Sequence, residues 1–504
     1  MDKTIIVIGA GVAGLSAGCY AQMNGYKTTI FELHDKPGGL CTAWKRHGYT
    51  IDGCVHWLVG SNPGTALYQL WEELGAVQNR QFVYADQYNR YEAKDGRTFT
   101  LYADIDRLEQ HMLELSPEDK NVIHEFCKAA RGFVKLDLPF GKPRELMNLL
   151  DYLKLSGAIL KYLPLMNWNR QTMIETMKRV KSPLIREAIL NAWSGTFPAG
   201  FLLATIAYLH KKAAGYPIGG SLEFARAIEK RYLNLGGDLK YNARVVKILV
   251  ENNKAIGIRL HDGTEIRADY IISAADMHAT IFDMLEGKYI DDTIRDYFNK
   301  LSPYTAIIFV GMGINRKFND IPVMVSSLRI ELPQPIKIAD RERTTIGLHV
   351  FNHDPTLAPA NKTSAVSMMA TSFEWWQNLH KDKNRYNAAK QEVADKLIEL
   401  LNQRFPGIAG QVEMRDVATP MTFVRYTGNW HGSIQGWSTT PQNWMMQFRK
   451  KLPGLDNFWM CGQWSEPLGG LPPAALSGRN AIQFICHQDK RKFTSNVPPR
   501  PQKD

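Results

Sequence analysis

Cysteine is scarce in this sequence and is never paired in a motif. The 504 residues contain six cysteines, without a CxxC pair or the spacing of metal ligands: Cys19, Cys41, Cys54, Cys127, Cys461 and Cys486. Such usage argues against a disulfide framework and favours free thiols in a reducing compartment, so we expect a cytoplasmic protein. His349 and His353 are four residues apart, but their segment is typical of a strand entering a turn, and we reject a metal site there.

Long apolar runs are also missing. No run of about 18 uncharged apolar residues occurs, so we expect no membrane-spanning helix. No basic and apolar leader precedes Thr4, so we expect no secretory signal. The most apolar stretch, Leu153 to Trp168, is interrupted by Lys154, Lys161 and Pro164.

This stretch lies in a basic part of the chain. Residues 135–187 contain ten Lys/Arg against five Asp/Glu, and the net charge of the whole chain is +11. An interfacial segment, with apolar side chains in the lipid boundary and lysines extended toward headgroups, fits this composition. We therefore expect peripheral attachment to a membrane surface, and lipid rather than nucleic acid as the partner. The alternative is a buried helix that caps a substrate pocket, and both roles can hold together.

The N-terminus carries a dinucleotide-binding fingerprint. TIIVI predicts a buried parallel strand, and GxGxxG follows directly with Gly9, Gly11 and Gly14 before an apolar helix. The first glycine permits the tight turn, the second lets a pyrophosphate approach the backbone, and the third lets helix and sheet pack closely. A second strand, KTTIFE, ends at Glu32, where a carboxylate can accept hydrogen bonds from ribose hydroxyls. Strand, glycines, helix, strand and acid in this order make the signal strong.

A glycine doublet, Gly38-Gly39, follows in DKPGGL. Here the sequence resembles the FAD family that includes glutathione reductase-like and amine oxidase-like flavoproteins, in which such a doublet extends the dinucleotide site. The resemblance implies FAD rather than NAD. No second complete fingerprint occurs, since GMG at Gly311–Gly313 lacks the third glycine and the acid and more plausibly belongs to a strand end.

Two later blocks resemble the same family. In YPIGGSLEFARAIEK…NARVVKILV, the valine of the VxxI segment, Val245, lies against the adenine in the family, although an ordinary crossover without a ligand role remains possible. In FWMCGQWSEPLGGLPPAALSGRNAI, a strand runs into Gly462 and a helix begins at about Pro473. The family usually has Gly-Asp there, whereas this chain has Gly462-Gln463, which brings no charge. The resemblance implies these cofactor-binding residues: Gly9, Ala10, Gly11, Ala13, Gly14, Glu32, Gly38, Gly39, Leu40, Val245, Gly462, Gln463 and Leu471.

Together the blocks resemble the phytoene desaturase, carotenoid isomerase and retinol saturase group. NHDPTLAPANKTSAV from Asn352 and GYTIDGCVHWLVG from Gly48 also match that group's segments. The resemblance implies an α/β fold with a discontinuous Rossmann-type FAD-binding domain, a mixed α+β substrate domain and a helical lid. We expect the FAD-binding domain at 1–75, 216–283 and 410–487, the substrate domain at 76–134 and 284–409, the lid or membrane-docking segment at 135–215, and a flexible tail at 488–504.

The expected chemistry belongs to the flavin, while the protein positions a carbon and moves a proton. His56 is our candidate for the proton transfer, since it follows the doublet where the family's chain passes near the flavin; a structural, hydrogen-bonded histidine is the alternative. Trp44 and Trp57 would line the flavin or a substrate tunnel, or are core aromatics.

The leading prediction is an FAD-dependent oxidoreductase that desaturates or saturates a long apolar carotenoid or retinoid-like substrate. The quinone class is one possible electron partner. The alternatives are a flavin-dependent cis–trans isomerase without net redox change, an amine or fatty-acid enzyme of the same fold, and a non-enzymatic lipid carrier. The intact glycines and Glu32 argue against the carrier.

Overall fold

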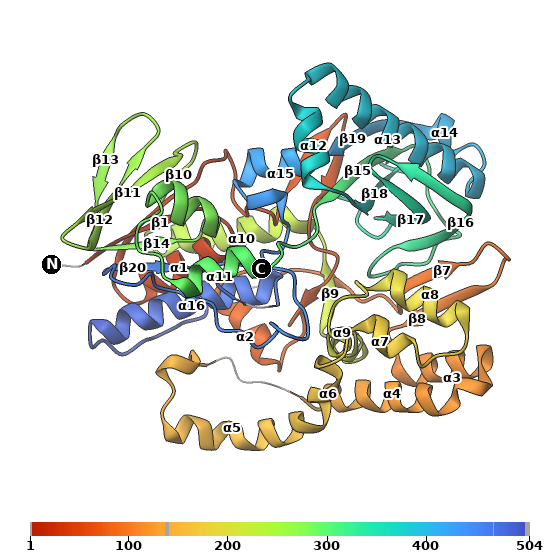
Figure 1. The fold of residues 1–504 in the computed structure, drawn as a ribbon, viewed down its shortest axis with the longest axis horizontal. Coiled ribbons are helices and arrows are strands. Elements are labelled where there is room, and N and C mark those ends of the chain that lie inside the picture. Colours follow the sequence, from red (N-terminus) through yellow and green to blue (C-terminus); the bar gives the residue numbers. More distant parts are fainter. Residues whose placement is uncertain (1–2, 137–140, 467, 499–504) are drawn as a thin grey trace, which may run out of the picture.

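A parallel sheet assembled from three distant parts of the chain forms one half of the molecule (Figure 1). The computed structural model describes residues 3–136, 141–466 and 468–498. The sheet has the order β10-β2-β1-β14-β20, and every neighbouring pair is parallel. Its strands are β1 (Thr4–Ile8), β2 (Lys27–Phe31), β10 (Asp238–Lys240), β14 (Tyr270–Ser273) and β20 (Phe458–Met460). This parallel sheet confirms the predicted fold class.

Helices cover this sheet at close range. The covering helices are α1 (Val12–Met23), α2 (Ala66–Glu73), α10 (Gly220–Asn234) and α16 (Leu471–Gln488). Gly478 of α16 lets it approach α1, because a Cβ at this position would lie 2.2 Å from the carbonyl oxygen of Ala13. The first helix and the last one, at opposite ends of the chain, therefore pack as neighbours.

A three-stranded antiparallel sheet lies beside the parallel one. It consists of β11 (Val245–Glu251), β12 (Lys254–Leu260) and β13 (Glu265–Arg267). Its apolar side chains share a core with Ile6 and Ile8 of β1. Helix α11 (Asp292–Lys300) contributes Ile294 to this core, so the segment expected at the start of the substrate domain packs against the parallel-sheet unit instead.

The other half contains a seven-stranded sheet of order β19-β15-β18-β17-β16-β7-β8. Its strands are β7 (Gln87–Glu92), β8 (Thr98–Tyr102), β15 (Ile307–Ile314), β16 (Leu328–Ile338), β17 (Arg341–Val350), β18 (Thr363–Ala370) and β19 (Val412–Ala418). The FAD-binding domain was expected to resume at residue 410. Residues 412–418 instead form β19, which pairs with β15 from Phe309–Ala418 to Ile314–Val412 and so belongs to the seven-stranded sheet. GMG lies within β15, where a Cβ on Gly311 would meet Ile51 at 2.7 Å.

The two faces of this sheet have different coverings. Helices α12 (Phe373–His380) and α13 (Lys383–Arg404) bury one face. The hairpin of β3 (Ala43–Arg46) and β4 (Tyr49–Asp52), which follows the glycine doublet, packs on the other. α14 (Ile408–Gln411) and α15 (Pro420–Thr427) complete this half. The second face therefore looks toward the parallel-sheet unit.

Helices from 105–210 form the lower part of the molecule in Figure 1. They are α3 (Ile105–Leu115), α4 (Lys120–Val134), α5 (Leu149–Tyr162), α6 (Met166–Asn169), α7 (Met173–Met177), α8 (Pro183–Ala192) and α9 (Ala199–His210). α3 and α4, expected in the substrate domain, share one apolar core with β7 and β8 of the seven-stranded sheet and also with α8 and α9. A small sheet of β5 (Leu58–Val59), β6 (Phe82–Val83) and β9 (Ala214–Pro217) joins this part to the FAD-binding side.

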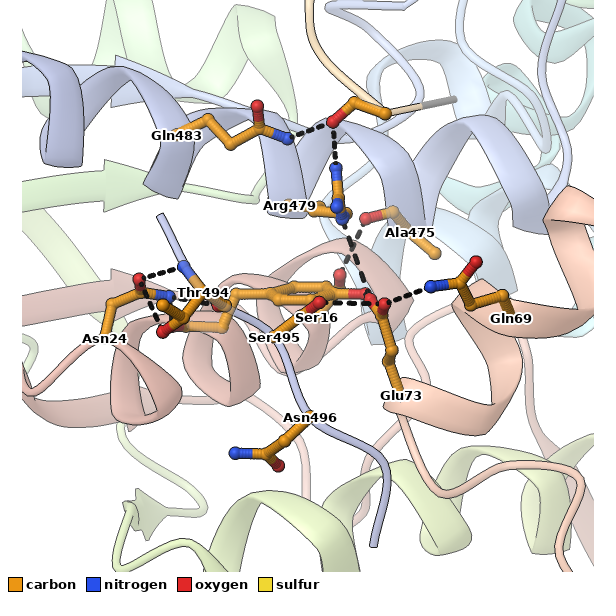
Figure 2. Close-up of polar contacts among 12 residues, drawn as sticks. Ser16, Asn24, Gln69, Glu73, Ala475, Arg479, Gln483, Thr494, Ser495 and Asn496 are labelled. Atoms are coloured by element: carbon orange, nitrogen blue, oxygen red, sulfur yellow. Dashed lines mark hydrogen bonds and ion pairs between the residues drawn. The ribbon is translucent and has the colours of Figure 1, made fainter. Parts of the chain in front are cut away.

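The C-terminal segment is bound to the parallel-sheet unit, contrary to the expected flexible tail from 488. Asn24 exchanges two hydrogen bonds with the backbone of Thr494, at 2.8 and 2.9 Å. Ser495 donates to the carboxylate of Glu73 at 2.8 Å, as Figure 2 shows. Arg231 donates to Asn496. The polar side chains that predicted fraying instead satisfy buried polar groups. Residues 499–504 lie outside the described part.

Glu73 explains why the segment binds. This buried carboxylate accepts from Tyr20 at 2.5 Å and from Gln69 at 3.2 Å, and it lies 3.7 Å from the guanidinium of Arg479 (Figure 2). Ser495 supplies a further donor. A buried carboxylate needs such donors because leaving one of its oxygens unpaired is costly.

Removing residues 491–504 is therefore expected to destabilise the protein by about 3 kcal/mol, the sum of one hydrogen bond to a charged group and partial loss of apolar burial. Phe493, whose ring lies 5.7 Å from that of Tyr20, leaves with the segment. Thermal unfolding followed by fluorescence checks this. Truncation after Asn496 is the matched control and should change little; equal effects of both truncations would contradict the prediction.

Candidate functional site

The glycine loop after β1 has the geometry of a phosphate-binding turn. Gly9 has a φ of +97°, and a Cβ at Gly14 would lie 1.9 Å from the Gly9 carbonyl oxygen, so the structure requires both glycines. A Cβ at Gly11 would meet nothing within 4 Å. Gly11 therefore borders open space at the N-terminus of α1, where backbone N–H groups and the helix dipole favour an anion.

The doublet lies against this loop. The N–H of Gly38 donates to the Ala10 carbonyl at 2.8 Å, and a Cβ on Gly39 would lie 3.3 Å from the Cα of Gly11. Leu40 follows, half-buried. The structure thus brings together two glycine motifs that are separated by some 25 residues in the sequence.

Glu32 lies at the carboxyl end of β2 and is buried. Its carboxylate accepts hydrogen bonds from the backbone N–H groups of Ala10, at 2.6 Å, and His34, at 2.9 Å. Burial raises the pKa of Glu32, and these hydrogen bonds oppose the shift. The N–H of Ala243 donates to the Glu32 carbonyl at 2.8 Å, which places the start of β11, and with it buried Val245, beside the same strand end.

The C-terminal block reaches the same edge of the sheet. Gly462 follows β20 with a φ of +107°, and the atom nearest to a Cβ there would be the Cβ of Ala13, at 3.7 Å. Its N–H is bonded to the hydroxyl of Ser477 in α16 at 2.7 Å. Gln463 comes next. Helix α16 begins at Leu471, two residues before the expected Pro473. It follows Gly470, where a Cβ would meet no atom within 4 Å.

These positions fit FAD. Parallel strands end together at one edge, where ligands of parallel α/β sheets bind. The open space over Gly11 and Gly470, two helix N-termini and the buried acid Glu32 are the features that an adenine dinucleotide requires. Which of the residues contact the cofactor stays a prediction.

His56 belongs to a group of imidazoles in which His349 is buried and His56 and His353 are half-buried. Its ring stacks on that of His349, with centroids 4.6 Å apart and an interplanar angle of 11°. His349 contacts the carbonyl of Ser326 through Nδ1, and its buried Nε2 has no partner among the described residues. The rings of His349 and His353 are 6.4 Å apart at 77°.

These histidines are neutral at pH 7. Burial, followed by the positive charge of Arg329, lowers the pKa of His56 to about 4. Burial likewise lowers the pKa of His353 to about 4, and that of His349 falls well below its usual value. His56 can therefore accept a hydrogen bond at neutral pH but does not titrate there, and its catalytic role stays a prediction.

The two tryptophans singled out in the sequence have different surroundings. Trp44 donates through Nε1 to Asp416 of β19 at 2.8 Å, which ties the hairpin to the sheet. Trp57 belongs to a chain of aromatic rings between the sheet and the helices. Its other members are Tyr88, Trp193, Phe197 and Tyr304. Neither Trp193 nor Arg329 belongs to a recognisable motif, so sequence reasoning missed both.

Comparison with known proteins agrees with this geometry. The phytoene desaturase (neurosporene-forming) of Rhodobacter capsulatus is 26% identical over 95% of this chain and 93% of its own. The chloroplastic prolycopene isomerase of Daucus carota is 23% identical over 94% of this chain and 78% of its own. The crystal structure of an oxidoreductase from Methanosarcina mazei has a TM-score of 0.58 at 18% identity, covering 95% of this chain and all of the other.

The family of flavin containing amine oxidoreductases matches residues 12–485. That match spans nearly the whole chain and includes Gly14, Glu32, the glycine doublet and the C-terminal block described above. The chain belongs to the flavin-containing amine oxidoreductases, and it is an FAD-dependent oxidoreductase.

Proposed function

We propose that this oxidoreductase changes the carbon–carbon bonds of a long apolar polyene or isoprenoid lipid. The aromatic chain of Trp57, Tyr88, Trp193, Phe197 and Tyr304 carries the proposal, because it offers an apolar lining next to His56. Flat rings align an extended hydrocarbon, which has no polar group by which to be oriented. Desaturase and isomerase relatives that act on carotenoids support this substrate class.

In this proposal the cofactor and the side chains have separate roles. Bound FAD supplies the two-electron chemistry. Desaturation removes two hydrogens, as one hydride equivalent and one proton, from adjacent carbons, and saturation adds them; net turnover then needs an electron acceptor or donor, for which the quinone class is our candidate. Trp57 and Trp193 exclude water from the hydrocarbon. To His56, which is neutral at pH 7, we assign the role of accepting a hydrogen bond or the proton.

A cis–trans isomerase is the second candidate. It would use the same lining and the same cofactor without net redox change, and the similarity to prolycopene isomerases favours keeping it.

An anaerobic assay separates the candidates. Purified FAD-loaded protein is mixed with liposomes that contain phytoene, partly desaturated carotenes or retinol, while flavin absorbance and products are followed together. Flavin bleaching with a more unsaturated product indicates a desaturase. Isomers that form only after chemical reduction of the flavin indicate an isomerase, and a saturated product after the same reduction indicates a saturase. No change with any polyene would overturn the proposal.

We also propose that α5 attaches the protein to membrane lipid. Four of its leucines are exposed: Leu149 (76%), Leu150 (65%), Leu153 (59%) and Leu160 (66%). Figure 1 places α5 along the lower edge of the molecule, and such exposure argues against the buried capping helix. Within the described residues, no helix is both long and apolar enough to cross a bilayer. The side chains of Lys154 and Lys161 lie outside the described part.

The triple substitution L150S/L153S/L160S is expected to weaken vesicle binding about 100-fold, since each leucine moved into lipid contributes about 1 kcal/mol when partly buried. Co-sedimentation with anionic phospholipid vesicles measures this. The double substitution L233S/V246S, at exposed apolar side chains of α10 and β11, is the matched control. Unchanged binding of the triple variant would contradict attachment through α5.

A further inference from the structure

Arg329 is a half-buried arginine that has no counter-ion among the described residues. It lies in β16 opposite Gly347 of β17, on the sheet face that also carries His349. Among the described residues it has no hydrogen bond and no ion pair, and its Nε is shielded from solvent and unpaired. A Cβ on Gly347 would lie 2.9 Å from Nη1, so the glycine makes room for the guanidinium.

An unpaired guanidinium whose Nε is shielded from solvent needs an explanation. Placing a charge inside a protein without a partner is unfavourable, and arginine keeps its proton under almost all conditions. Burial depresses the pKa of Arg329, and Tyr88 is the titratable neighbour that counters this shift. A neutral phenol does not balance a positive charge. The missing anion is therefore expected to come from a ligand.

A cavity of about 240 Å³ adjoins this guanidinium. Arg343 also lines it; one of its N–H groups donates to the carbonyl of Ala370, while its buried Nε has no partner among the described residues. The acid in the lining, Glu342, is exposed, and the nearby Asp340 already accepts from Thr371 and from the N–H of Ser372. The cavity thus presents two guanidiniums with spare donors, a fork that matches a carboxylate.

The cavity adjoins the proposed substrate site. The charge of Arg329 acts on both His56 and Tyr88, and Tyr88 packs on Trp57 and Trp193. A volume of about 240 Å³ holds a small polar head and not an extended polyene. The aromatic lining and the cationic cavity therefore suit the two parts of one amphipathic molecule.

We propose that the substrate carries a carboxylate at one end, which binds Arg329 with Arg343 as the second cation. For a polyene or isoprenoid acid this rests on the proposed function above. The same charge disfavours an ammonium, so an amine is a poor substrate in this pocket.

Binding measured with three probes tests the assignment. FAD-loaded full-length protein is titrated with retinoic acid, its methyl ester and retinol, through quenching of tryptophan fluorescence. We expect the acid to bind at least 10-fold more tightly than the ester. Arg329→Met should remove this preference, with ester affinity changed less than about 3-fold, and Arg329→Lys should restore part of it. Arg341→Met, at an exposed arginine of the neighbouring strand β17, is the matched control and should keep the preference.

The alternatives have distinct results. Equal affinity for acid and ester in the unaltered protein overturns the proposal. So does an Arg329→Met variant that loses all three ligands together with a changed flavin spectrum, because the guanidinium would then serve the cofactor or the fold. If no retinoid binds but oleic acid binds through Arg329, the polyene proposal fails and the carboxylate site stands.

Discussion

Replacing Gly11 with leucine is expected to abolish FAD binding while the protein still folds. Gly11 has an ordinary extended backbone, with φ −65° and ψ 172°, and a Cβ there meets no protein atom within 4 Å. A leucine side chain would therefore occupy only the space in which the pyrophosphate is expected to lie. Gly14 differs, since any Cβ there collides with Gly9 and disturbs the fold itself.

We expect the affinity for FAD to fall more than ~100-fold, which corresponds to about 3 kcal/mol. Flavin content after purification, from the absorbance ratio of flavin to protein, measures the loss, and circular dichroism reports the fold. Gly410→Leu is the matched control, because a Cβ at Gly410 also meets nothing within 4 Å but lies in α14. Full flavin content in Gly11→Leu would refute the assigned pyrophosphate position.

Acid is expected to destabilise the protein through its buried imidazoles. The pKa of His56 and that of His353 fall from 6.5 to about 4 on burial, so between these values the unfolded chain binds protons that the folded chain does not. Stability is therefore full above pH 6.5 and declines as the pH falls. Each of the two histidines is expected to contribute a loss of about 2 kcal/mol at pH 5, and His349 adds to it.

Two buried carboxylates oppose this trend. Burial raises the pKa of Asp52 and that of Asp276 to about 6, so the folded state takes up their protons more readily than the unfolded chain and gains stability as the pH falls. Their combined gain at pH 5 is about 3 kcal/mol, which is less than the loss from three histidines.

Comparing variants isolates the contribution of one imidazole to the pH dependence of stability. Urea midpoints at pH 7.5 and 5.0 should fall closer together in His56→Gln than in the unaltered protein, because glutamine does not titrate. His261→Gln, at an exposed histidine, should leave the pH response unchanged. An unaltered pH response in His56→Gln would show that this ring is protonated freely in the folded state.

FAD could be predicted from the sequence because its binding site is formed by motifs that lie close together in the chain. Gly9, Gly11 and Gly14 follow one strand at fixed spacing, and Glu32 ends the next, so backbone sterics and strand–helix periodicity within some 30 residues determine the turn. The interrupted apolar run from Leu153 similarly predicted an unusual surface, and its helix is exposed.

The grouping of residues at the proposed substrate site depends on tertiary structure and could not be predicted from the sequence. His56 follows β4, while Arg329 and His349 come from strands near residue 340, and antiparallel pairing in the seven-stranded sheet brings them together. The place of β19 in that sheet likewise depends on β15, about 100 residues earlier in the chain, and Ser495 binds Glu73 at a separation of 422 residues. Local sequence determines a turn or a helix, whereas strand register and burial of charge follow from packing across the whole chain, which no short motif records.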